Sequence, residues 1–422
     1  MAKIIFAVFG SLGDLHPHVA LGLELKERGH SVAFATLEYY REKLKMLGFE
    51  FFSMRPNIVP DDRDMARDLM DAKKGTEKLL REFIFPILPE SYEDLSAAAK
   101  NFDLIIASEV AFAAPIVSEK YQIPFISTTL APGGFFSAYD PIVPPNMQWF
   151  GHLRFLGAGF HQALRKIVLD KMIWPWSESV RELRRKLGLR DDVEPILRDK
   201  FSNLLNLALF SKVLGVPQPD WHEPTVQTGF AFYDGQKDLG RVPEGLVEFL
   251  QAGAPPIVFT LGSAAVWDAR DFFHDSAVAA QKLNSRAILI LGENQPPKKL
   301  PPEIAVFDYA PYSEVFPHAS IVVHQGGVGT TSQALRAGVP QLIVPFSHDQ
   351  PDNAARCVRF GCARSVSRDY YSALRAEKEL QELLAKSSYK ERAREAQNVV
   401  NSENGVKSAC DAIEEILIKV EK

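Results

Sequence analysis

Residues 324–354 read HQGGVGTTSQALRAGVPQLIVPFSHDQPDNA, and this stretch decides how the rest of the chain is interpreted. A glycine-rich turn leads into a helical segment over 330–336, a buried strand over 341–346 and a polar loop over 347–353. Free amides and the positive dipole end make the start of such a helix a ready anion site. The polar loop follows the carboxyl end of its strand, where open α/β sheets bind ligands. One ligand with phosphate and hydroxyl groups would satisfy both loops.

The size and composition of the chain favour a globular protein of two or more domains. Its 422 residues exceed one ordinary hydrophobic core, with 46% hydrophobic and 24% charged residues. The net charge of −5 and the lack of a long basic run disfavour a nucleic-acid partner. No apolar run reaches the roughly 18–20 residues of a membrane span, and the run over 4–9 is too short for a signal peptide. We therefore expect a cytoplasmic protein without an integral membrane segment.

Neither the cysteines nor the acidic motifs indicate a metal site. Cys357, Cys362 and Cys410 are odd in number and lack metal-ligand spacing, so we expect free, mostly buried thiols. Asp62-Arg63-Asp64 is the nearest match to an Asp-x-Asp metal motif, but it lies in a charged stretch and not after an apolar strand. We interpret that motif as solvated surface, and we expect neither a metal nor a resident cofactor.

Apolar runs alternate with helical stretches along both halves of the chain. This alternation predicts mostly parallel sheets with right-handed crossovers. The segment over 140–160 is rich in proline, glycine and aromatic residues and is predicted to be irregular, and a domain boundary is expected between 211 and 238. The predicted strands cover 3–10, 31–36, 103–108, 124–129, 256–262, 287–292, 304–309, 320–325 and 341–346.

An ordered set of motifs resembles the family 1 glycosyltransferases. The series His-x-Gly-Gly-x-Gly-Thr, Ala-Gly-x-Pro and Asp-Gln-x-x-Asn in 324–353 is similar to their donor-binding segment. The resemblance implies the α/β GT-B fold: two facing Rossmann-like domains with parallel sheets and a C-terminal helix that packs back on the first domain. The implied domains are 1–215 for the acceptor, 216–403 for the nucleotide-sugar donor and 404–422 for the returning helix.

The resemblance also assigns residues to the nucleotide. The diphosphate would be held by His324, by the backbone around Gly327, Gly329 and Thr330, and by Ser263 in the loop TLGSAAV. Fixed N–H donors would stabilise the charge that the leaving diphosphate gains. A lone Gly-Ser after a strand is otherwise a simple turn. The assignment of Ser263 to the phosphates therefore rests on the other donor motifs that accompany it.

The segment YAPYSEVF is similar to the family's Trp-Ala-Pro-Gln block, which meets the base and ribose. Tyr309 would stack on the uracil and Ala310 would meet the base edge through its backbone. Tyr312 and Ser332 replace the family's ribose-contacting Gln and Glu, which leaves the choice between UDP and dTDP open. Alternatively, Tyr309 and Tyr312 are core aromatic residues at the end of a strand and contact no ligand.

The sugar would be bound by the acidic-Gln pair of the motif. Asp349 would accept hydrogen bonds from sugar hydroxyls, and the Gln350 amide can both donate and accept. Asp and Asn also favour plain turns at strand ends, so a structural role is the alternative.

The first glycine turn carries the predicted general base. Plant members of the family have Gly-His-x-x-Pro, whereas this chain has Gly13-Asp14-Leu15-His16-Pro17, similar to many bacterial members. A carboxylate facing the acceptor hydroxyl can remove its proton as the oxygen attacks the anomeric carbon. Asp14 is also a favourable helix-capping residue, and His16 is the alternate base. Glu109 loosely matches the residue that orients the plant base, or it only lines the pocket.

The acceptor is expected in the first domain, against large apolar residues in or beside loops. They hint at a flat lipophilic acceptor, although loop aromatics can equally fill the core. The candidates are Phe83, Phe85, Phe112, Phe135, Phe136, Met147, Trp149 and Phe150.

The resulting hypothesis is an inverting, metal-independent hexosyltransferase with a nucleotide-sugar donor and a lipophilic small-molecule acceptor as partners. The expected donor is UDP-glucose, with a dTDP-sugar as the alternative, and the acceptor is a phenol or flavonoid, a polyketide or a sterol-like alcohol. Two other functions stay open at this point: a nucleotide-sugar epimerase on the same fold, and a non-catalytic nucleotide-sugar or lipid-binding protein.

Overall fold

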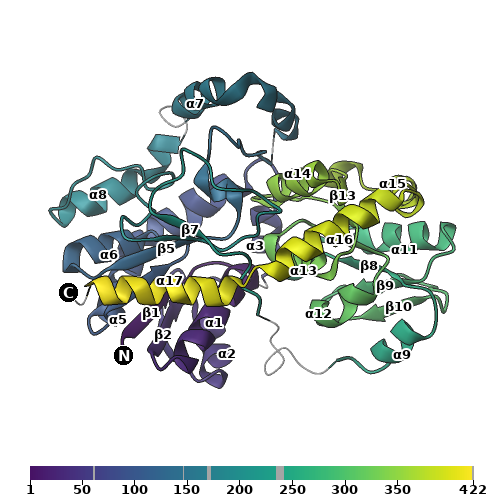
Figure 1. Ribbon diagram of the computed structural model, residues 1–422, viewed down its shortest axis with the longest axis horizontal. Coiled ribbons are helices and arrows are strands. Elements are labelled where there is room, and N and C mark those ends of the chain that lie inside the picture. The colour runs from purple at the N-terminus through teal and green to yellow at the C-terminus, as the bar shows by residue number, and fades with distance from the viewer. Residues whose placement is uncertain (60–61, 146, 169–172, 234–241, 421–422) are drawn as a thin grey trace.

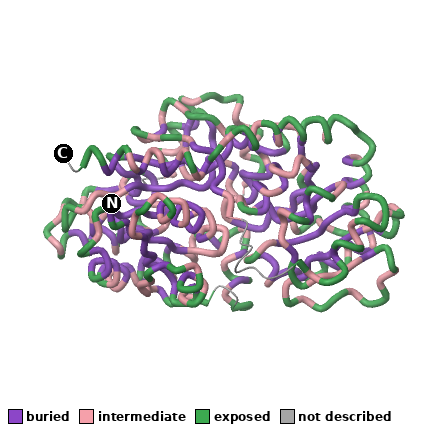
Figure 2. Tube along the Cα trace, turned by 60° about the horizontal axis from the view of Figure 1, so that its bottom comes forward, coloured by how far each residue is buried: buried purple, intermediate pink, exposed green. Residues whose placement is uncertain are grey.

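The computed structural model describes residues 1–59, 62–145, 147–168, 173–233 and 242–420 of the chain. Two α/β units stand side by side, each with helices packed around its own sheet (Figure 1). Figure 2 shows the chain buried along the centre of each unit and exposed along its outer loops. This architecture confirms the predicted pair of Rossmann-like domains with parallel sheets.

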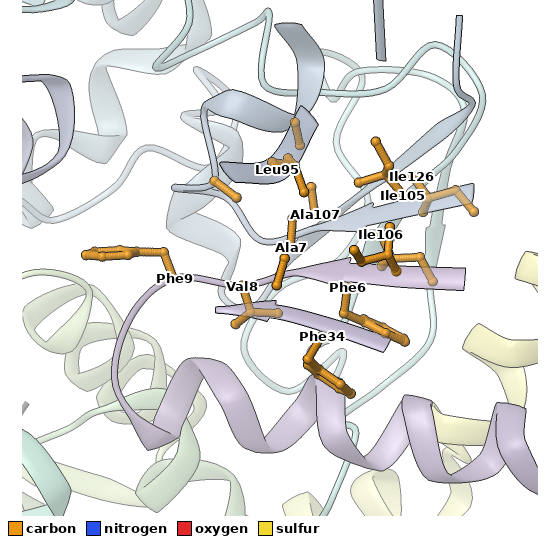
Figure 3. Close-up of a cluster of buried hydrophobic side chains, with 14 of the residues drawn as sticks. Phe6, Ala7, Val8, Phe9, Phe34, Leu95, Ile105, Ile106, Ala107 and Ile126 are labelled. Atoms are coloured by element: carbon orange, nitrogen blue, oxygen red, sulfur yellow. The ribbon is translucent and has the colours of Figure 1, made fainter. Parts of the chain in front are cut away.

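The first sheet has seven strands in the order β3-β2-β1-β4-β5-β6-β7, and every described pairing is parallel. Its central strands are almost wholly apolar because helices cover both faces. The rings of Phe6 and Phe34 stack with centroids 4.9 Å apart, and Ile105, Ile106 and Ile126 fill the same core (Figure 3). The strands are β1 (Lys3–Ala7), β2 (Ser31–Thr36), β3 (Glu50–Ser53), β4 (Leu104–Ala107), β5 (Phe125–Thr129), β6 (Asn206–Ala208) and β7 (Thr225–Gln227).

The second sheet has six strands, also parallel, in the order β10-β9-β8-β11-β12-β13. The two central strands, β8 and β11, are adjacent, so the strand order reverses between them, and this is where open α/β sheets bind ligands. The strands are β8 (Ile257–Thr260), β9 (Ala287–Ile290), β10 (Ile304–Phe307), β11 (Ile321–His324), β12 (Gln341–Ile343) and β13 (Ala363–Ser365).

Seventeen α-helices are assigned within the described ranges. Those of the first half are α1 (Leu12–Glu27), α2 (Arg41–Met46), α3 (Arg63–Leu69), α4 (Gly75–Lys78), α5 (Leu88–Ala99), α6 (Ala113–Tyr121), α7 (Gly157–Val168) and α8 (Glu178–Lys186). Those of the second half are α9 (Leu246–Gln251), α10 (Gly262–Ala265), α11 (Phe272–Lys282), α12 (Tyr312–Val315), α13 (Val328–Ala337), α14 (Gln350–Phe360), α15 (Ala373–Ala385), α16 (Ser387–Ser402) and α17 (Gly405–Val420).

Each predicted strand contains an observed one, but four strands were missed. They are β3, β6, β7 and β13, of three or four residues each. Because β7 pairs with β6, the first sheet extends to Gln227, beyond the predicted boundary at residue 215. The segment predicted to be irregular is 3₁₀-helical over Gln148–Leu156 and continues into α7.

The C-terminal helix α17 packs back onto the first domain, as expected. Ala409, Cys410 and Ile413 are fully buried in the core cluster that contains β1 and α1. At the rim of this contact, Arg28 of α1 forms ion pairs of 2.7 Å with both Asp411 and Glu414. Figure 1 shows α17 lying across the lower left of the molecule, beside α1.

A buried arginine joins the two domains at a second point. The Arg356 guanidinium on α14 pairs with Asp140 of the first domain and, at 2.7 Å, with Asp352 one turn earlier. It also donates to the Leu214 carbonyl at 3.0 Å, and Asp352 accepts from the Val143 amide at 3.0 Å. Nearby aspartates raise the pKa of Arg356 despite its burial, so the charge is retained inside the interface.

Cys357, Cys362 and Cys410 are free and buried, which confirms the prediction for the thiols. No helix among the described residues is long and apolar enough to cross a membrane.

Candidate active site

Several helix N-termini meet where the two domains face each other. A Cβ atom added to Gly329, in the first turn of α13, would lie 4.0 Å from the Cα of Gly13, in the first turn of α1. The start of α14 joins them, because Asn353 donates at 3.0 Å to the Gly326 carbonyl and at 2.7 Å to Asp349. Amides and positive dipole ends from three helices therefore converge, which favours a strongly anionic ligand.

The glycine-rich turn before α13 has little room for side chains. Gly326 has a φ of 92°, and an added Cβ would lie 2.8 Å from Ile343 and 3.0 Å from the Gln350 carbonyl. Gly327 is the N-cap of α13 and leaves the first-turn amides uncovered. The predicted anion site at Gly327, Gly329 and Thr330 thus has the expected backbone framework.

His324, which is predicted to contact the diphosphate, lies behind this turn. Its Nδ1 accepts from the Gly326 amide at 3.0 Å, so its Nε2 carries the proton and donates to Gln341 Oε1 at 2.8 Å. The side chain is fully buried, and burial lowers its pKa to about 4. Both nitrogens are occupied, so His324 shapes the turn and presents no free nitrogen to a diphosphate.

Tyr312 connects the two predicted phosphate loops. Its hydroxyl lies 2.8 Å from that of Thr260 and also hydrogen-bonds the Thr330 side chain and the Gly262 backbone. Its ring stacks on Phe316 with centroids 4.5 Å apart, and burial raises its pKa. The tyrosine that replaces the family's glutamine therefore holds the loops together, which sequence reasoning did not foresee.

The remaining donor residues differ in accessibility. Ser263 is exposed in the first turn of α10, and the Tyr309 side chain is 40% exposed, so both can be reached by a ligand. Ala310 is buried, which leaves only its backbone for contact with a base. Ser332 donates to the Gly329 carbonyl at 2.8 Å within α13 and is itself buried.

Gln350, predicted to bind sugar hydroxyls, has its side-chain oxygen engaged by the protein. Its Oε1 accepts from the amides of Phe346 and Ser347 at 2.8 and 3.3 Å, and its amide nitrogen lies 3.8 Å from Met70 Sδ in the first domain. Asp349 remains a candidate, and its Oδ2 accepts a hydrogen bond from Asn353. Asn353, which was not among the predicted site residues, holds Asp349 against the glycine turn.

Asp14 is the N3 residue of a capping box at the start of α1, and it also faces the domain interface. Ser11 is the N-cap of α1, and its amide and hydroxyl donate to Asp14 Oδ2 at 2.8 and 3.1 Å. No hydrogen bond to Oδ1 occurs among the described residues. Burial is the largest influence and raises the pKa of Asp14 to about 6, with a smaller contribution from the charge of Glu109. The capping role and a role as base are therefore compatible.

The two nearby histidines have different surroundings. His16, the alternate base, is half-buried, with its ring centroid 5.1 Å from that of Tyr233. His18 was not predicted: its Nδ1 lies 2.6 Å from the Asp14 carbonyl oxygen and its Nε2 lies 2.8 Å from Thr128 Oγ1. Burial lowers the pKa of His18 to about 4, so a neutral imidazole braces the first turn of α1.

Glu109 follows β4 and is held by a buried lysine that the sequence did not reveal. Lys200 Nζ lies 3.0 Å from Glu109 Oε2, and the Leu130 amide donates to Oε1 at 3.2 Å. An added Cβ at Gly134 would lie 2.3 Å from Oε2, so only glycine leaves room for this carboxylate. Glu109 is fixed in place by these contacts.

The carboxylates of Asp14, Glu109 and Asp349 influence one another. Burial raises the pKa of Asp349 to about 7, and the charges of Asp14 and Glu109 add to this effect. Neighbouring carboxylates with raised pKa values oppose one another's ionisation near neutral pH. Such a group is typical of a catalytic or ligand-binding site.

The predicted acceptor residues divide into core and surface. Phe85 and Phe112 are buried with ring centroids 5.1 Å apart, so they belong to the core and that part of the prediction is corrected. Phe135 stacks between Trp221 and Phe201 at 4.1 and 5.3 Å. Trp149 is exposed, and the half-buried candidates are Phe83, Phe136, Met147 and Phe150.

A cavity of about 600 Å³ lies between α7 and the segment 194–201. Phe135, Phe136 and Phe201 contribute aromatic lining, and Arg165 and Asp220 contribute charge. Lys200 lies 5.5 Å from the Phe136 ring centroid while it pairs with Glu109, so the carboxylate cluster and the cavity share a wall. No cluster of three or more potential metal ligands occurs in the described part of the chain.

Two family models match the two domains. Residues 4–137 match the Glycosyltransferase family 28 N-terminal domain, and residues 278–415 match the Erythromycin biosynthesis protein CIII-like, C-terminal domain.

Relatives match over nearly the whole chain. The O-mycaminosyltylonolide 6-deoxyallosyltransferase of Streptomyces fradiae is 31% identical over 98% of this chain and 97% of its own length. Sterol 3-beta-glucosyltransferases of Arabidopsis thaliana and Yarrowia lipolytica are 27% and 28% identical over 83% and 98% of this chain. The chain spans 55% and 29% of the length of these two enzymes.

Solved structures share the fold at low sequence identity. The calicheamicin glycosyltransferase superposes with a TM-score of 0.75 at 19% identity over the full length of both chains. The glycosyltransferase VinC in complex with dTDP gives 0.72 at 19% identity over 99% of this chain and 100% of its own. The chain therefore belongs to the family 1 glycosyltransferases of bacterial type with the GT-B fold, and it is an enzyme of the hexosyltransferase class.

Proposed function

We propose that this enzyme moves a hexose from a nucleoside diphosphate sugar to a hydroxyl group of a lipophilic small molecule, with inversion and without a metal ion. The observation that carries the proposal is the approach of the first turn of α1, which carries Gly13 and Asp14, to Gly329 and the uncovered amides at the start of α13. One ligand can thus meet an anion site and a carboxylate base at the same time.

The proposed reaction is a single displacement. The Asp14 carboxylate takes the acceptor proton as the acceptor oxygen forms its bond to the anomeric carbon. The bond between that carbon and the diphosphate oxygen breaks on the opposite face, which inverts the configuration. The electron pair stays on the diphosphate, where the amides of Gly329 and Thr330 stabilise the new charge. Asp349 binds the sugar hydroxyls, and His324 and Tyr312 position the loops.

For the donor we propose UDP-glucose first. The exposed Tyr309 and the backbone of Ala310 offer a stacking surface and an edge contact for a pyrimidine base. Both uracil and thymine fit that description, and two solved glycosyltransferases of this fold are complexes with thymidine diphosphate (dTDP). A dTDP-sugar is therefore the matched alternative in the test below.

For the acceptor we propose a polyketide, sterol-like or phenolic alcohol. The names of the relatives include a tylonolide derivative and sterols. The cavity beside Phe136 is large enough for part of such a molecule, and its aromatic lining suits an apolar ring system.

The test is mass spectrometry on mixed pools of macrolide, sterol and phenolic acceptors, incubated with UDP-glucose or dTDP-glucose in the presence of EDTA. We expect acceptors to gain a hexose with the wild type and far less with Asp14→Asn. An anomeric configuration retained in the product, or activity that requires a divalent ion, contradicts the proposed mechanism.

The two other functions that the sequence leaves open are tested by two added readouts: chromatographic sugar analysis of an acceptor-free control, and a nucleotide-binding assay. Isomerisation of the donor sugar without an acceptor indicates an epimerase. Tight nucleotide binding with neither transfer nor isomerisation across the donor and acceptor pools indicates a binding protein.

A further inference from the structure

A short arm of the first domain is embedded in the second domain. We call residues 63–76 the arm; it contains α3 and the start of α4, and it lies between β3 and β4 in the chain. Figure 1 shows α3 at the centre of the molecule, where the two domains meet. Met70 is buried and belongs to the hydrophobic cluster of the second domain, whose other described members begin at Ile257. The arm therefore completes a core that lies outside its own domain.

Polar contacts fix α3 on the loops that follow β8 and β9. Arg63 donates to the Glu293 carbonyl at 3.2 Å, and its guanidinium carbon lies 5.5 Å from the ring centroid of Trp267. Arg67 lies 3.9 Å from the buried Asp268. These contacts hold the arm in place independently of the loop that it meets at its other end.

That loop covers residues 346–350, and we call it the β12–α14 loop. Ser347 Oγ donates to the Asp71 carbonyl at 3.0 Å, and Gln350 Nε2 lies 3.8 Å from Met70 Sδ. Both side chains of the loop are buried. The arm therefore forms one wall of the β12–α14 loop.

Gly75 shows how closely the arm and the loop fit. A Cβ atom added to Gly75 would lie 2.1 Å from the Leu69 carbonyl oxygen and 2.8 Å from Ser347 Oγ. Any larger residue at this position therefore has to push the arm or the loop aside.

His348 connects the arm to Asp349, the next residue in the chain. Its φ of 57° lies in the left-handed region, which residues other than glycine rarely adopt. Its Nδ1 lies 3.1 Å from Thr76 Oγ1, and the Leu69 backbone accepts a hydrogen bond from the ring. Burial lowers the pKa of His348 to about 4, and a neutral imidazole offers the one donor and one acceptor that these partners require. The arm therefore holds the strained backbone directly before Asp349.

We propose that the arm is a positioning element for the donor sugar: through His348 it sets where the Asp349 carboxylate meets the sugar hydroxyls. The inference rests on the proposed function, in which Asp349 binds these hydroxyls. Asn353 holds the same carboxylate from within the second domain, so Asp349 is fixed from both sides of the interface. Leu69, Thr76 and His348 are positioning residues, and the first domain thereby takes part in sugar selection without touching the sugar.

The test compares a nucleotide sugar with the bare nucleotide in calorimetric titrations of the full chain without an acceptor. The probes are UDP-glucose and UDP, or dTDP-glucose and dTDP if wild type binds that pair more tightly. His348→Gly keeps the left-handed backbone, which glycine adopts readily, but loses both contacts with the arm. Gly75→Ala displaces the arm from the other side. In both variants the Kd for the nucleotide sugar should rise about three- to tenfold relative to that for the nucleotide, because a hydrogen bond to the sugar is weakened.

Two further substitutions separate positioning from stability. Lys299→Gly is the matched control for His348→Gly, because Lys299 is exposed in the second domain and also has a positive φ, of 60°. It should leave both Kd values unchanged. Thr76 lies at the surface, so its substitution opens no cavity. Thr76→Val should raise the ratio of the two Kd values, whereas Thr76→Ser keeps the hydroxyl and should retain the wild-type ratio.

Several results would overturn the inference. They are a wild-type ratio in His348→Gly, an equal rise of both Kd values in that variant, and a rise of the ratio in Lys299→Gly as large as in His348→Gly. A wild type that binds neither nucleotide sugar overturns the inference together with the proposed function. A wild type that binds one of them but transfers no hexose contradicts only the proposed reaction, because the titration contains no acceptor.

Discussion

Asp14 shows how one residue can serve structure and chemistry at once. One oxygen of its carboxylate receives two hydrogen bonds from the N-cap Ser11, which orients the group, while the other points to no protein donor among the described residues. An added Cβ at Gly10 would lie 2.3 Å from that first oxygen, so the preceding glycine is needed for the geometry. The capping interaction therefore also orients the carboxylate that is proposed as the base.

The first prediction separates the two roles of Asp14. Asp14→Asn can keep the capping hydrogen bonds but cannot accept a proton, so kcat should fall by about 10²- to 10⁴-fold with little change in Tm. Ser11→Ala is the matched control, with a stability loss of about 1 kcal/mol and a smaller loss of rate. Initial rates and thermal unfolding of both variants provide the measurement. Full activity in Asp14→Asn moves the base to His16.

The second prediction concerns pH. Because burial raises the pKa of Asp14 to about 6, the base is protonated below that pH and ionised above it. The value of kcat/KM should therefore fall as pH drops through about 6. Glu109→Gln removes a negative charge that raises this pKa, so the same limb should move to lower pH. A limb that stays in place in Glu109→Gln shows that another group titrates.

The motifs predicted which loops carry the candidate site, but not the direction of each side chain. Asp14, Glu109 and Asp349 influence the same site across 335 positions of the chain, because the first two follow β1 and β4 of the first sheet and the third follows β12 of the second. His324 and Gln350 turn toward the protein, because Gln341 and the amides after β12 compete for them. Such partners are set by tertiary contacts that no local motif records.

At the scale of elements, long buried strands were predictable and short marginal ones were not. The run at β1 is apolar and buried from Ile4 to Ala7, whereas β6 and β7 have three residues each and begin or end with polar side chains. Three residues give too little periodicity to distinguish a strand from a loop. The turn before α13 was predictable because a positive φ and close packing leave glycine as the only fit.

The third prediction tests that turn. Gly326→Ala should raise the KM for the nucleotide sugar, because the new Cβ collides with Ile343 and the Gln350 carbonyl and displaces the amides of α13. Gly245→Ala is the matched control, since its φ of 79° is also positive but nothing lies within 4 Å of an added Cβ. It should cost stability by about 1 kcal/mol and leave the donor KM unchanged. Equal donor KM values in the two variants contradict the proposed anion site.

At the scale of the whole molecule, two of the contacts that join the domains differ in kind. One is the apolar packing of α17 on the first domain, and the other is the buried Arg356 with its aspartates. The family motifs implied the first and gave no sign of the second. A buried ion pair is sensitive to partial removal, because the remaining charges lose their compensation.

The fourth prediction follows from this sensitivity of a buried ion pair to the loss of one partner. Arg356→Met leaves Asp140 and Asp352 in the interface without their shared cation, so the free energy of unfolding should fall by about 3–5 kcal/mol. Arg359→Met removes a half-exposed arginine 3.4 Å from Asp140 and should cost only about 0–1 kcal/mol. Urea unfolding of both variants provides the comparison. Equal losses indicate that the two arginines contribute alike to the interface.

The path of α17 bears on the construction of hybrid enzymes. The helix is encoded after the second domain, yet its buried residues Ala409, Cys410 and Ile413 complete the core of the first domain. A chimera made by a single crossover near residue 230 would pair this helix with a foreign α1 and mismatch Arg28 with its carboxylates. Exchange of donor specificity therefore calls for two crossovers, with the second before Gly405, so that each core keeps the helix that evolved with it.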